Sequence, residues 1–321
     1  MTLPIIAATI GDPGGVGPEV CVKAVATGEL DELCRPLLIG NIGAIRLAAA
    51  TSGLDLDLVA VDDIDHLPST GIAVLDPGNL SAGDWRVGEP SAASGAAAMR
   101  WLEIARELAE GGRVAGWVEA PLDSTSLRLA GAITELDDLQ PPGTYVLRVG
   151  GHLRVVPITE HIPFRSIPDS VSVDAILTLV RLVGGAFRSW GIAAPRIGVA
   201  GLNPHAMGRE DAERIAPAVA AARGEGWDCN GPVSPDAIFR QCMEGRYDVV
   251  VSMYHDQGQI AVKTAAFAGA CSIFLGLPYI HLSIPHGSAM DIAGQGKAQH
   301  LSMLSGLKTA AALSSGQGFL S

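Results

Sequence analysis

The chain has 321 residues, of which 48% are hydrophobic and 17% charged, and its mean hydropathy is +0.30. This composition excludes an intrinsically disordered chain, and the 39 glycines and 20 prolines follow no period, which excludes a collagen-like repeat. The 22 basic and 34 acidic residues give a net charge of −12, which argues against nucleic acid or an anionic membrane as a partner.

Short apolar runs alternate with helical stretches along the chain. The runs predict strands at residues 3–10, 36–39, 72–75, 114–118, 145–147, 153–158, 196–200, 248–253, 271–275 and 281–284. Helices are predicted from Pro18 onward and at residues 91–111, 169–191, 211–224 and 297–314. Because strands and helices alternate throughout, we expect an α/β protein with a mostly parallel sheet, or two, and two interleaved domains with a cleft between them.

The cysteines and the N-terminus bear on the compartment. Five cysteines are widely spaced without a C-x-x-C pair, and the first residues lack the basic segment and cleavage site of a signal peptide. Residues 264–290 carry no Asp, Glu, Lys or Arg, but prolines and glycines interrupt them, which favours short buried strands over a membrane span. We therefore predict reduced thiols and a cytoplasmic protein.

Two glycine-rich loops lie at opposite ends of the chain. Residues 11–17, with the sequence GDPGGVG, connect a predicted strand to a predicted helix, where glycines permit close approach to a ligand and a helix N-terminus favours an anion. This segment is neither the G-x-G-x-x-G fingerprint nor a P-loop. Residues 286–298 form a second loop of small residues, in which Asp291 is a candidate cap for the following helix.

Three histidines follow predicted strands. They are His161, His205 and His255, and each ring would project from a strand end, where ligand sites of α/β proteins form. Three imidazoles from separate strands suit a borderline divalent cation and leave positions open for substrate. Asp256 follows His255 directly and could orient its ring. The alternative interpretation is that each histidine only satisfies a local hydrogen bond.

The two loops together resemble those of isocitrate and isopropylmalate dehydrogenases, whose adenine-binding loop and N-terminal turn have similar sequences. The whole set of motifs, from Ile10 to about Leu304, more closely resembles the 4-hydroxythreonine-4-phosphate dehydrogenase family. The resemblance implies two α/β/α domains with the active site in the cleft between them. We expect a nucleotide-binding domain at residues 1–130 plus 265–321, and a metal, substrate and dimerisation domain at residues 131–264.

The resemblance also implies roles for single residues. In that family three histidines bind a divalent cation (Zn, Mg, Mn or Co) at a dimer interface, which identifies the metal ligands as His161, His205 and His255. Lys263 matches a lysine that contacts substrate, and Asp236 an aspartate near the metal; with Asp256 they are the candidate catalytic residues. The candidate substrate contacts are Thr134, Lys263, Ser272 and His281. NAD or NADP would be bound by Gly11, Asp12, Gly14, Gly15, Gly17, His286, Gly287, Asp291 and Gly294.

The sequence departs from this family where the substrate is held. The histidine of the family's Gly-His-Thr-Glu motif is Ile133 here, although Thr134 is kept, and an arginine is replaced by His281. A nearby asparagine corresponds to Ser272, and a Pro-Val-His-Lys stretch reads Pro-Leu-Asp-Ser, with Asp123 in place of the histidine. Because histidine does not reproduce the bidentate geometry of arginine toward phosphate or carboxylate, a changed substrate is expected.

These observations leave several functions open. The leading hypothesis is a metal- and NAD(P)-dependent dehydrogenase that oxidises the hydroxyl of a 3-hydroxy acid, with decarboxylation of the β-keto acid. The first alternative is a dehydrogenase of aromatic cis-dihydrodiol carboxylates, such as the terephthalate dihydrodiol. A non-catalytic nucleotide- or metal-binding module and a zinc hydrolase are alternatives from other classes. The expected partners are a small hydroxy-carboxylate and a second copy of the chain in a homodimer.

Overall fold

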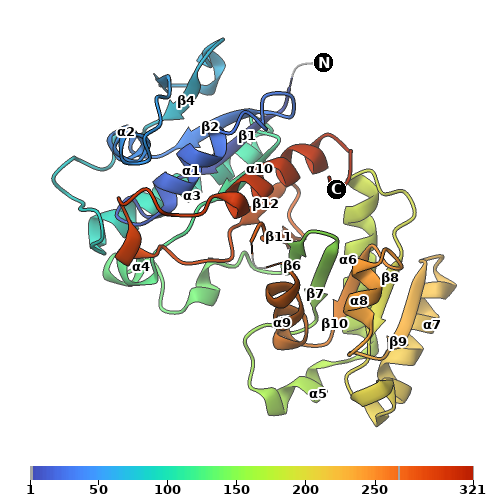
Figure 1. The fold of residues 1–321 in the computed structure, drawn as a ribbon. Helices are drawn as coiled ribbons and strands as arrows, with labels where there is room; N and C mark the ends of the chain where they lie inside the picture. The colour runs from blue at the N-terminus through green and yellow to red at the C-terminus, as the bar shows by residue number, and fades with distance from the viewer. Residues whose placement is uncertain (1–2, 267, 321) are drawn as a thin grey trace. The chain divides into compact units, whose positions relative to one another are not determined.

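The computed structural model describes residues 3–266 and 268–320, which divide into two compact units. Unit 1 comprises residues 1–141 and 277–315, and unit 2 comprises residues 142–276 and 316–321. Residues 265–276, which the sequence analysis assigned to the nucleotide-binding domain, lie in unit 2, and so does the C-terminal segment. Each unit is an α/β structure in which helices pack beside the strands (Figure 1).

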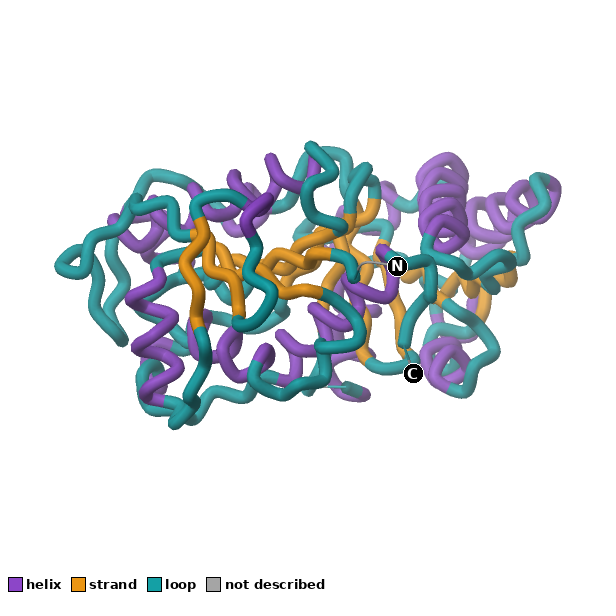
Figure 2. Tube along the Cα trace, turned by 90° about the horizontal axis from the view of Figure 1, so that it is seen from above, coloured by secondary structure: helices purple, strands orange, loops and turns teal. Residues whose placement is uncertain are grey.

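The sheet of unit 1 has the strand order β3-β4-β2-β1-β5-β12, and every pair within it is parallel. Its strands are β1 (Ile5–Thr9), β2 (Arg35–Ile39), β3 (Leu58–Val61), β4 (Ile72–Leu75), β5 (Gly116–Glu119) and β12 (Ile280–Ser283). Its helices are α1 (Gly17–Val25), α2 (Ile42–Thr51), α3 (Ala92–Glu110), α4 (Ser124–Leu129) and α10 (Leu301–Ser314). Helices lie on both sides of these strands (Figure 2), so the central strands are buried on both faces and read as continuous apolar runs.

The sheet of unit 2 has the order β11-β6-β7-β10-β8-β9. Its strands are β6 (Tyr145–Gly150), β7 (Leu153–Pro157), β8 (Ile197–Ala200), β9 (Cys229–Val233), β10 (Val249–Ser252) and β11 (Cys271–Leu275). Its helices are α5 (Ile167–Ser170), α6 (Val173–Ser189), α7 (Ala216–Gly224), α8 (Ile238–Met243) and α9 (His255–Ala265). β6 and β7 form the expected antiparallel hairpin, β11 is antiparallel to β6, and the remaining pairs are parallel.

Three predicted helices differ from those observed. The helix expected at residues 169–191 is divided into α5 and α6, because the Ser172 hydroxyl accepts the Ala175 N–H and begins a new helix. The helix expected at 211–224 opens with a π turn at Asp211–Ile215. The helix expected from residue 297 begins at Leu301, so Asp291 does not cap it and lies instead in the short 3₁₀ turn Met290–Ile292.

A search for membrane spans finds no single helix in the described residues that is long and apolar enough to cross a bilayer. Two helical segments, Phe164–Ser170 and Val173–Ser189, together have the length and composition of a membrane span, but the chain bends between them.

Candidate functional site

Two of the three predicted metal ligands lie together in unit 2. β7, β10 and β8 are neighbouring parallel strands, so the segments that follow them begin at the same edge of the sheet. His161 follows β7 and His255 begins α9 directly after β10, and their ring centroids are 4.8 Å apart. The sequence therefore placed both imidazoles correctly at strand ends.

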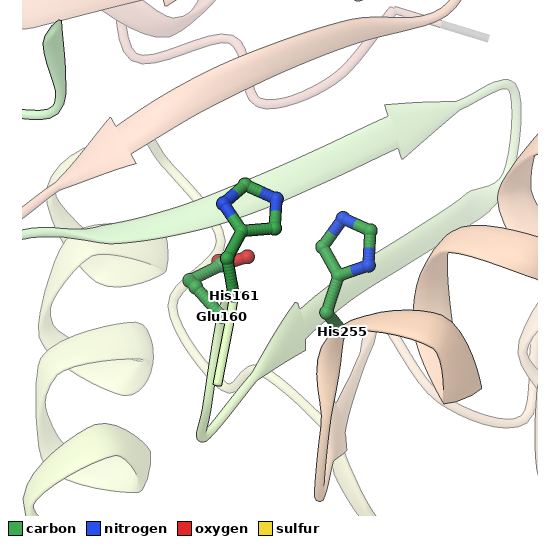
Figure 3. A group of neighbouring side chains, drawn as sticks. All are labelled: Glu160, His161 and His255. Atoms are coloured by element: carbon green, nitrogen blue, oxygen red, sulfur yellow. The ribbon is translucent and has the colours of Figure 1, made fainter. Parts of the chain in front are cut away.

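A carboxylate joins this pair of histidines. One potential ligand atom each from Glu160, His161 and His255 lies within 4.8 Å of the others, and Figure 3 shows the three side chains gathered in front of the sheet. Two imidazoles and a carboxylate are a chemically suitable donor set for a divalent transition metal or magnesium. The donor set present thus fits the cation that the sequence analysis expected.

The orientation of His255 is set by its neighbour. Asp256 Oδ1 lies 2.7 Å from His255 Nδ1, which leaves Nε2 as the ring nitrogen available to a cation. The rest of the Asp256 side chain is exposed in the first turn of α9. A cavity of about 280 Å³ opens beside these groups and is lined by Glu160, His161, Ile162, Phe164, Ile167, Tyr254, His255 and Asp256.

The third predicted ligand, His205, is not part of the Glu160–His161–His255 group. It lies in the short turn Pro204–Ala206 with a positive φ of 56°. Its charge acts on Asp236: a hydrogen bond from the Ser234 hydroxyl and, to a lesser extent, His205 lower the pKa of the Asp236 carboxyl. His205 and Asp236, both singled out from the sequence, are thus neighbours of each other.

The remaining candidate residues of unit 2 differ in exposure. Lys263 is exposed in the last turn of α9, the helix that His255 begins. Ser272 is buried in β11 with 6% exposure. Glu160 and its partner Arg148 were missed by the sequence analysis. Glu160 could have been suspected from its position next to His161, whereas nothing in the sequence distinguishes Arg148 from any other strand residue.

In unit 1 the structure brings the two glycine-rich loops together. The Val16 N–H donates to the Ser288 carbonyl at 2.8 Å, and a Cβ on Gly15 would lie 2.7 Å from that same oxygen. Gly11 has a φ of +67°, and a Cβ there would lie 2.2 Å from the Pro121 carbonyl, so only glycine fits. The two loops that resemble a nucleotide-binding site from opposite chain ends are therefore adjacent.

A salt-bridged pair holds the second loop to helix α1. Lys23 Nζ donates to Glu19 Oε1 at 2.7 Å and to the carbonyls of Gly296 and Ala298, each at 2.9 Å. The Ala298 N–H in turn donates to Glu19 Oε1. Glu19 is 2% exposed, so these contacts are shielded from water and connect α1 firmly to the end of the loop.

Asp12 organises the first loop from inside. Its Oδ1 accepts the Gly14 N–H at 2.8 Å, and the side chain is 1% exposed. Burial, and to a lesser extent the negative charge of Asp123, raises the pKa of Asp12 above its ordinary value, against the opposing hydrogen bonds from Ser126 and Gly14. His286, Gly287, Asp291 and Gly294, the other cofactor candidates, are exposed along the second loop.

The candidate substrate residues of unit 1 differ in how far they are buried. His281 is 3% exposed in β12, stacks on Trp117 at 3.7 Å between centroids, and has Nε2 3.2 Å from Glu119 Oε2. Thr134 is exposed, while Ile133 is buried. His281 thus lies within the sheet, where it is paired with an acid.

A cavity of about 380 Å³ in unit 1 lies between β5 and the second glycine-rich loop. Two carboxylates, Glu119 and Asp123, line it together with Ser288, whose hydroxyl donates to Asp123 Oδ2 at 2.7 Å. Among the described residues that line this cavity, none is a lysine or an arginine. A cavity of this charge disfavours an anionic group.

Comparison with known proteins places the chain in a family. Residues 32–310 match the model of the pyridoxal phosphate biosynthetic protein PdxA. The chain belongs to the PdxA family. A Novosphingobium aromaticivorans protein provisionally described as a 4-hydroxythreonine-4-phosphate dehydrogenase is 43% identical over 319 residues, which cover 98% of this chain and 96% of that protein.

Two solved structures define the relationship further. The 4-hydroxythreonine-4-phosphate dehydrogenase of Klebsiella pneumoniae superposes with a TM-score of 0.85 at 36% identity, covering 97% of this chain and 99% of that one. The terephthalate 1,2-cis-dihydrodiol dehydrogenase of Burkholderia xenovorans LB400 gives a TM-score of 0.69 at 30% identity, with 99% of both chains covered. The expected α/β fold and the resemblance to the PdxA family are thereby confirmed.

Proposed function

We propose that this PdxA-family protein is a divalent-metal- and NAD(P)-dependent dehydrogenase that oxidises the hydroxyl of a 3-hydroxy acid, with loss of CO₂ from the resulting β-keto acid. The observation that carries the proposal is the convergence of His161 and His255 with a carboxylate beside an open cavity. Relatives that are named as dehydrogenases and match nearly the full length of the chain support the same reaction class.

The residues of this chain would divide the work. His161 and His255 would hold the cation, and Asp256 would keep the His255 ring in the tautomer that exposes Nε2. The loops at residues 11–17 and 286–296 would hold NAD(P). When bound, the cation would supply Lewis acidity toward the substrate oxygens and the nicotinamide would accept the hydride. Lys263, in the last turn of the helix that His255 begins, would move the proton of the substrate hydroxyl, a role that rests on the family resemblance.

A homodimer is part of this proposal. Unit 2 exposes large apolar side chains: Phe164, which lines the cavity beside the histidine pair, is 76% exposed, Met207 is 83% exposed and Ile260 is 65% exposed. Exposed apolar groups of this size are typical of surfaces that associate. His205 is not part of the Glu160–His161–His255 group, and the family resemblance implies metal ligands that are shared between subunits.

A dihydrodiol carboxylate is the second candidate substrate. The cavity of unit 1 is lined by two carboxylates and by no lysine or arginine among the described residues, which disfavours a doubly charged phosphate group. Ile133, which stands where the family resemblance implies a histidine, is buried and offers no donor. The 30% identity to a terephthalate dihydrodiol dehydrogenase points in the same direction.

Absorbance of NAD(P)H with metal-loaded protein tests the proposal. Phosphorylated 3-hydroxy acids and aromatic cis-dihydrodiol carboxylates are offered in parallel, with NAD and with NADP, and His255→Ala serves as the control. Reduction with the first set supports the hydroxy-acid reaction, whereas reduction with the dihydrodiols alone supports the second candidate. No turnover of either set, despite tight metal binding, contradicts both and favours a binding module.

A further inference from the structure

The carboxylate beside the histidine pair is held by a buried arginine. Arg148 in β6 donates from Nη1 to Glu160 Oε1 at 3.1 Å and from Nη2 to Glu160 Oε2 at 2.7 Å. The side chains are 8% and 18% exposed, respectively. Two parallel charge-assisted bonds of this kind fix the position and plane of a carboxylate.

This ion pair needs an explanation beyond stability. Taking two charges out of water costs free energy that their mutual attraction seldom exceeds, so an apolar pair would stabilise the fold as well or better. Arg148 makes one further bond, to the Val146 carbonyl at 3.2 Å, which belongs to its own strand. The pair is therefore weak evidence for added stability, and what its geometry shows is that it orients Glu160.

The orientation leaves Glu160 able to bind a second positive group. An ionised carboxylate offers about four lone-pair sites, and the arginine fork uses two of them. A ligand atom of Glu160 lies within 4.8 Å of ligand atoms of His161 and His255, and the carboxylate is seen beside the two rings in Figure 3. A cation among the three would be surrounded by two imidazole nitrogens and one oxygen.

We infer that Glu160 is a direct ligand of the divalent cation, beside His161 and His255, and that Arg148 is the positioning residue that orients it. The inference rests on the proposed metal site. It also bears on the cation class: a carboxylate oxygen added to imidazole ligands strengthens the binding of manganese more than that of zinc, which imidazoles alone already suit. The negative charge of Glu160 is shared between Arg148 and the cation.

Direct metal titration tests the inference without any substrate. Manganese binding is followed by the electron paramagnetic resonance of free Mn²⁺, and zinc binding by competition with a chromogenic chelator. We expect Glu160→Gln to weaken manganese binding by about tenfold or more, and zinc binding less, so that the zinc-over-manganese preference rises. Glu225→Gln is the matched control, because Glu225 pairs with Arg181 on the exposed surface of the same unit.

Two further variants separate ligation from folding. Glu160→Gln leaves the Arg148 charge buried without a counter-charge, so Arg148→Met combined with Glu160→Gln removes both charges, and the same loss of manganese binding is expected of a protein with unchanged circular dichroism. In Arg148→Lys the fork is lost but the charge remains. Here we expect a shift of the visible Co²⁺ absorption bands, since these report the geometry of the ligands.

The outcomes distinguish this inference from the proposed function. If Glu160→Gln binds manganese and zinc as the unaltered protein does, with the same Co²⁺ spectrum, Glu160 is only the partner of Arg148 and the inference is wrong. The proposed metal site then still stands, provided that His255→Ala loses binding. If His255→Ala also binds both metals normally, the proposed metal site itself is wrong.

Discussion

At the scale of single residues, the candidate metal site contains pairs of residues that lie next to each other in the chain. Asp256 orients His255 and Glu160 adjoins His161, so each histidine of the group has an acidic sequence neighbour. Such local pairing can be recognised from sequence. The contacts of Glu160 with Arg148 and of Asp123 with Ser288 cannot be recognised from sequence, because only strand register and loop packing bring these partners close.

Asp12 allows a prediction of pH dependence. Because burial raises its native pKa above 3.8, the folded state binds the proton more tightly than the unfolded state, and stability falls as pH rises through the native pKa. Asp12→Asn keeps an oxygen for the Gly14 N–H without the buried charge. We expect the free energy of unfolding of the variant to match that of the unaltered protein near pH 3.5 and to exceed it at pH 7.

Urea unfolding at several pH values measures this difference. Asp55→Asn, at an exposed position of the same unit, is the control and should show no such growth with pH. A constant difference between Asp12→Asn and the unaltered protein across the range would contradict a buried titrating group at residue 12.

At the scale of elements, the start of a helix was predicted correctly where the sequence signal of its cap was recognised. Ser91, the first residue of the helix predicted at residues 91–111, is the cap of that helix, because its hydroxyl accepts the Ser94 N–H at the start of α3. Ser172 was overlooked because the apolar pattern continues across it, and there the predicted long helix is interrupted. The start of α10 was predicted too early because residues 296–298 are engaged by Lys23 and Glu19.

Ser172→Ala should destabilise unit 2 by about 1 kcal/mol, since the cap of α6 loses its acceptor for the Ala175 N–H. Ser172→Asp retains an acceptor and adds a favourable negative charge at the helix N-terminus, so it should be close to neutral. The rate of amide hydrogen exchange in α6 at low denaturant measures this loss of stability in the helix itself. Equal loss in both variants would mean that the hydroxyl acts through some contact other than capping.

At the scale of the whole molecule, the two candidate ligand sites belong to different units. The histidine–carboxylate group lies within unit 2, and the paired glycine-rich loops lie within unit 1. A ligand that binds only the folded form of one unit stabilises that unit by an amount set by its concentration relative to its Kd.

Hydrogen exchange should resolve the two sites. Saturating Mn²⁺, at about 100 times its Kd, should slow exchange of the most protected amides of β7, β10 and α9 by up to about 100-fold. NAD(P) should instead protect residues 11–17 and 286–296. His255→Ala should abolish the Mn²⁺ effect and leave the cofactor effect intact. Protection of the glycine-rich loops by Mn²⁺ alone would contradict this assignment of sites to units.

The sequence by itself determined the α/β class, the family, most strands, and the histidines and glycine-rich loops that carry the candidate chemistry. These features depend on local sequence patterns, namely apolar runs, helix caps and the order of motifs along the chain, none of which requires the tertiary structure. Only the tertiary structure decided that Glu160 joins His161 and His255 and that His281 is buried against Trp117. These are decided by which strands become neighbours and in which register, and contacts between residues far apart in the chain leave no local pattern to read.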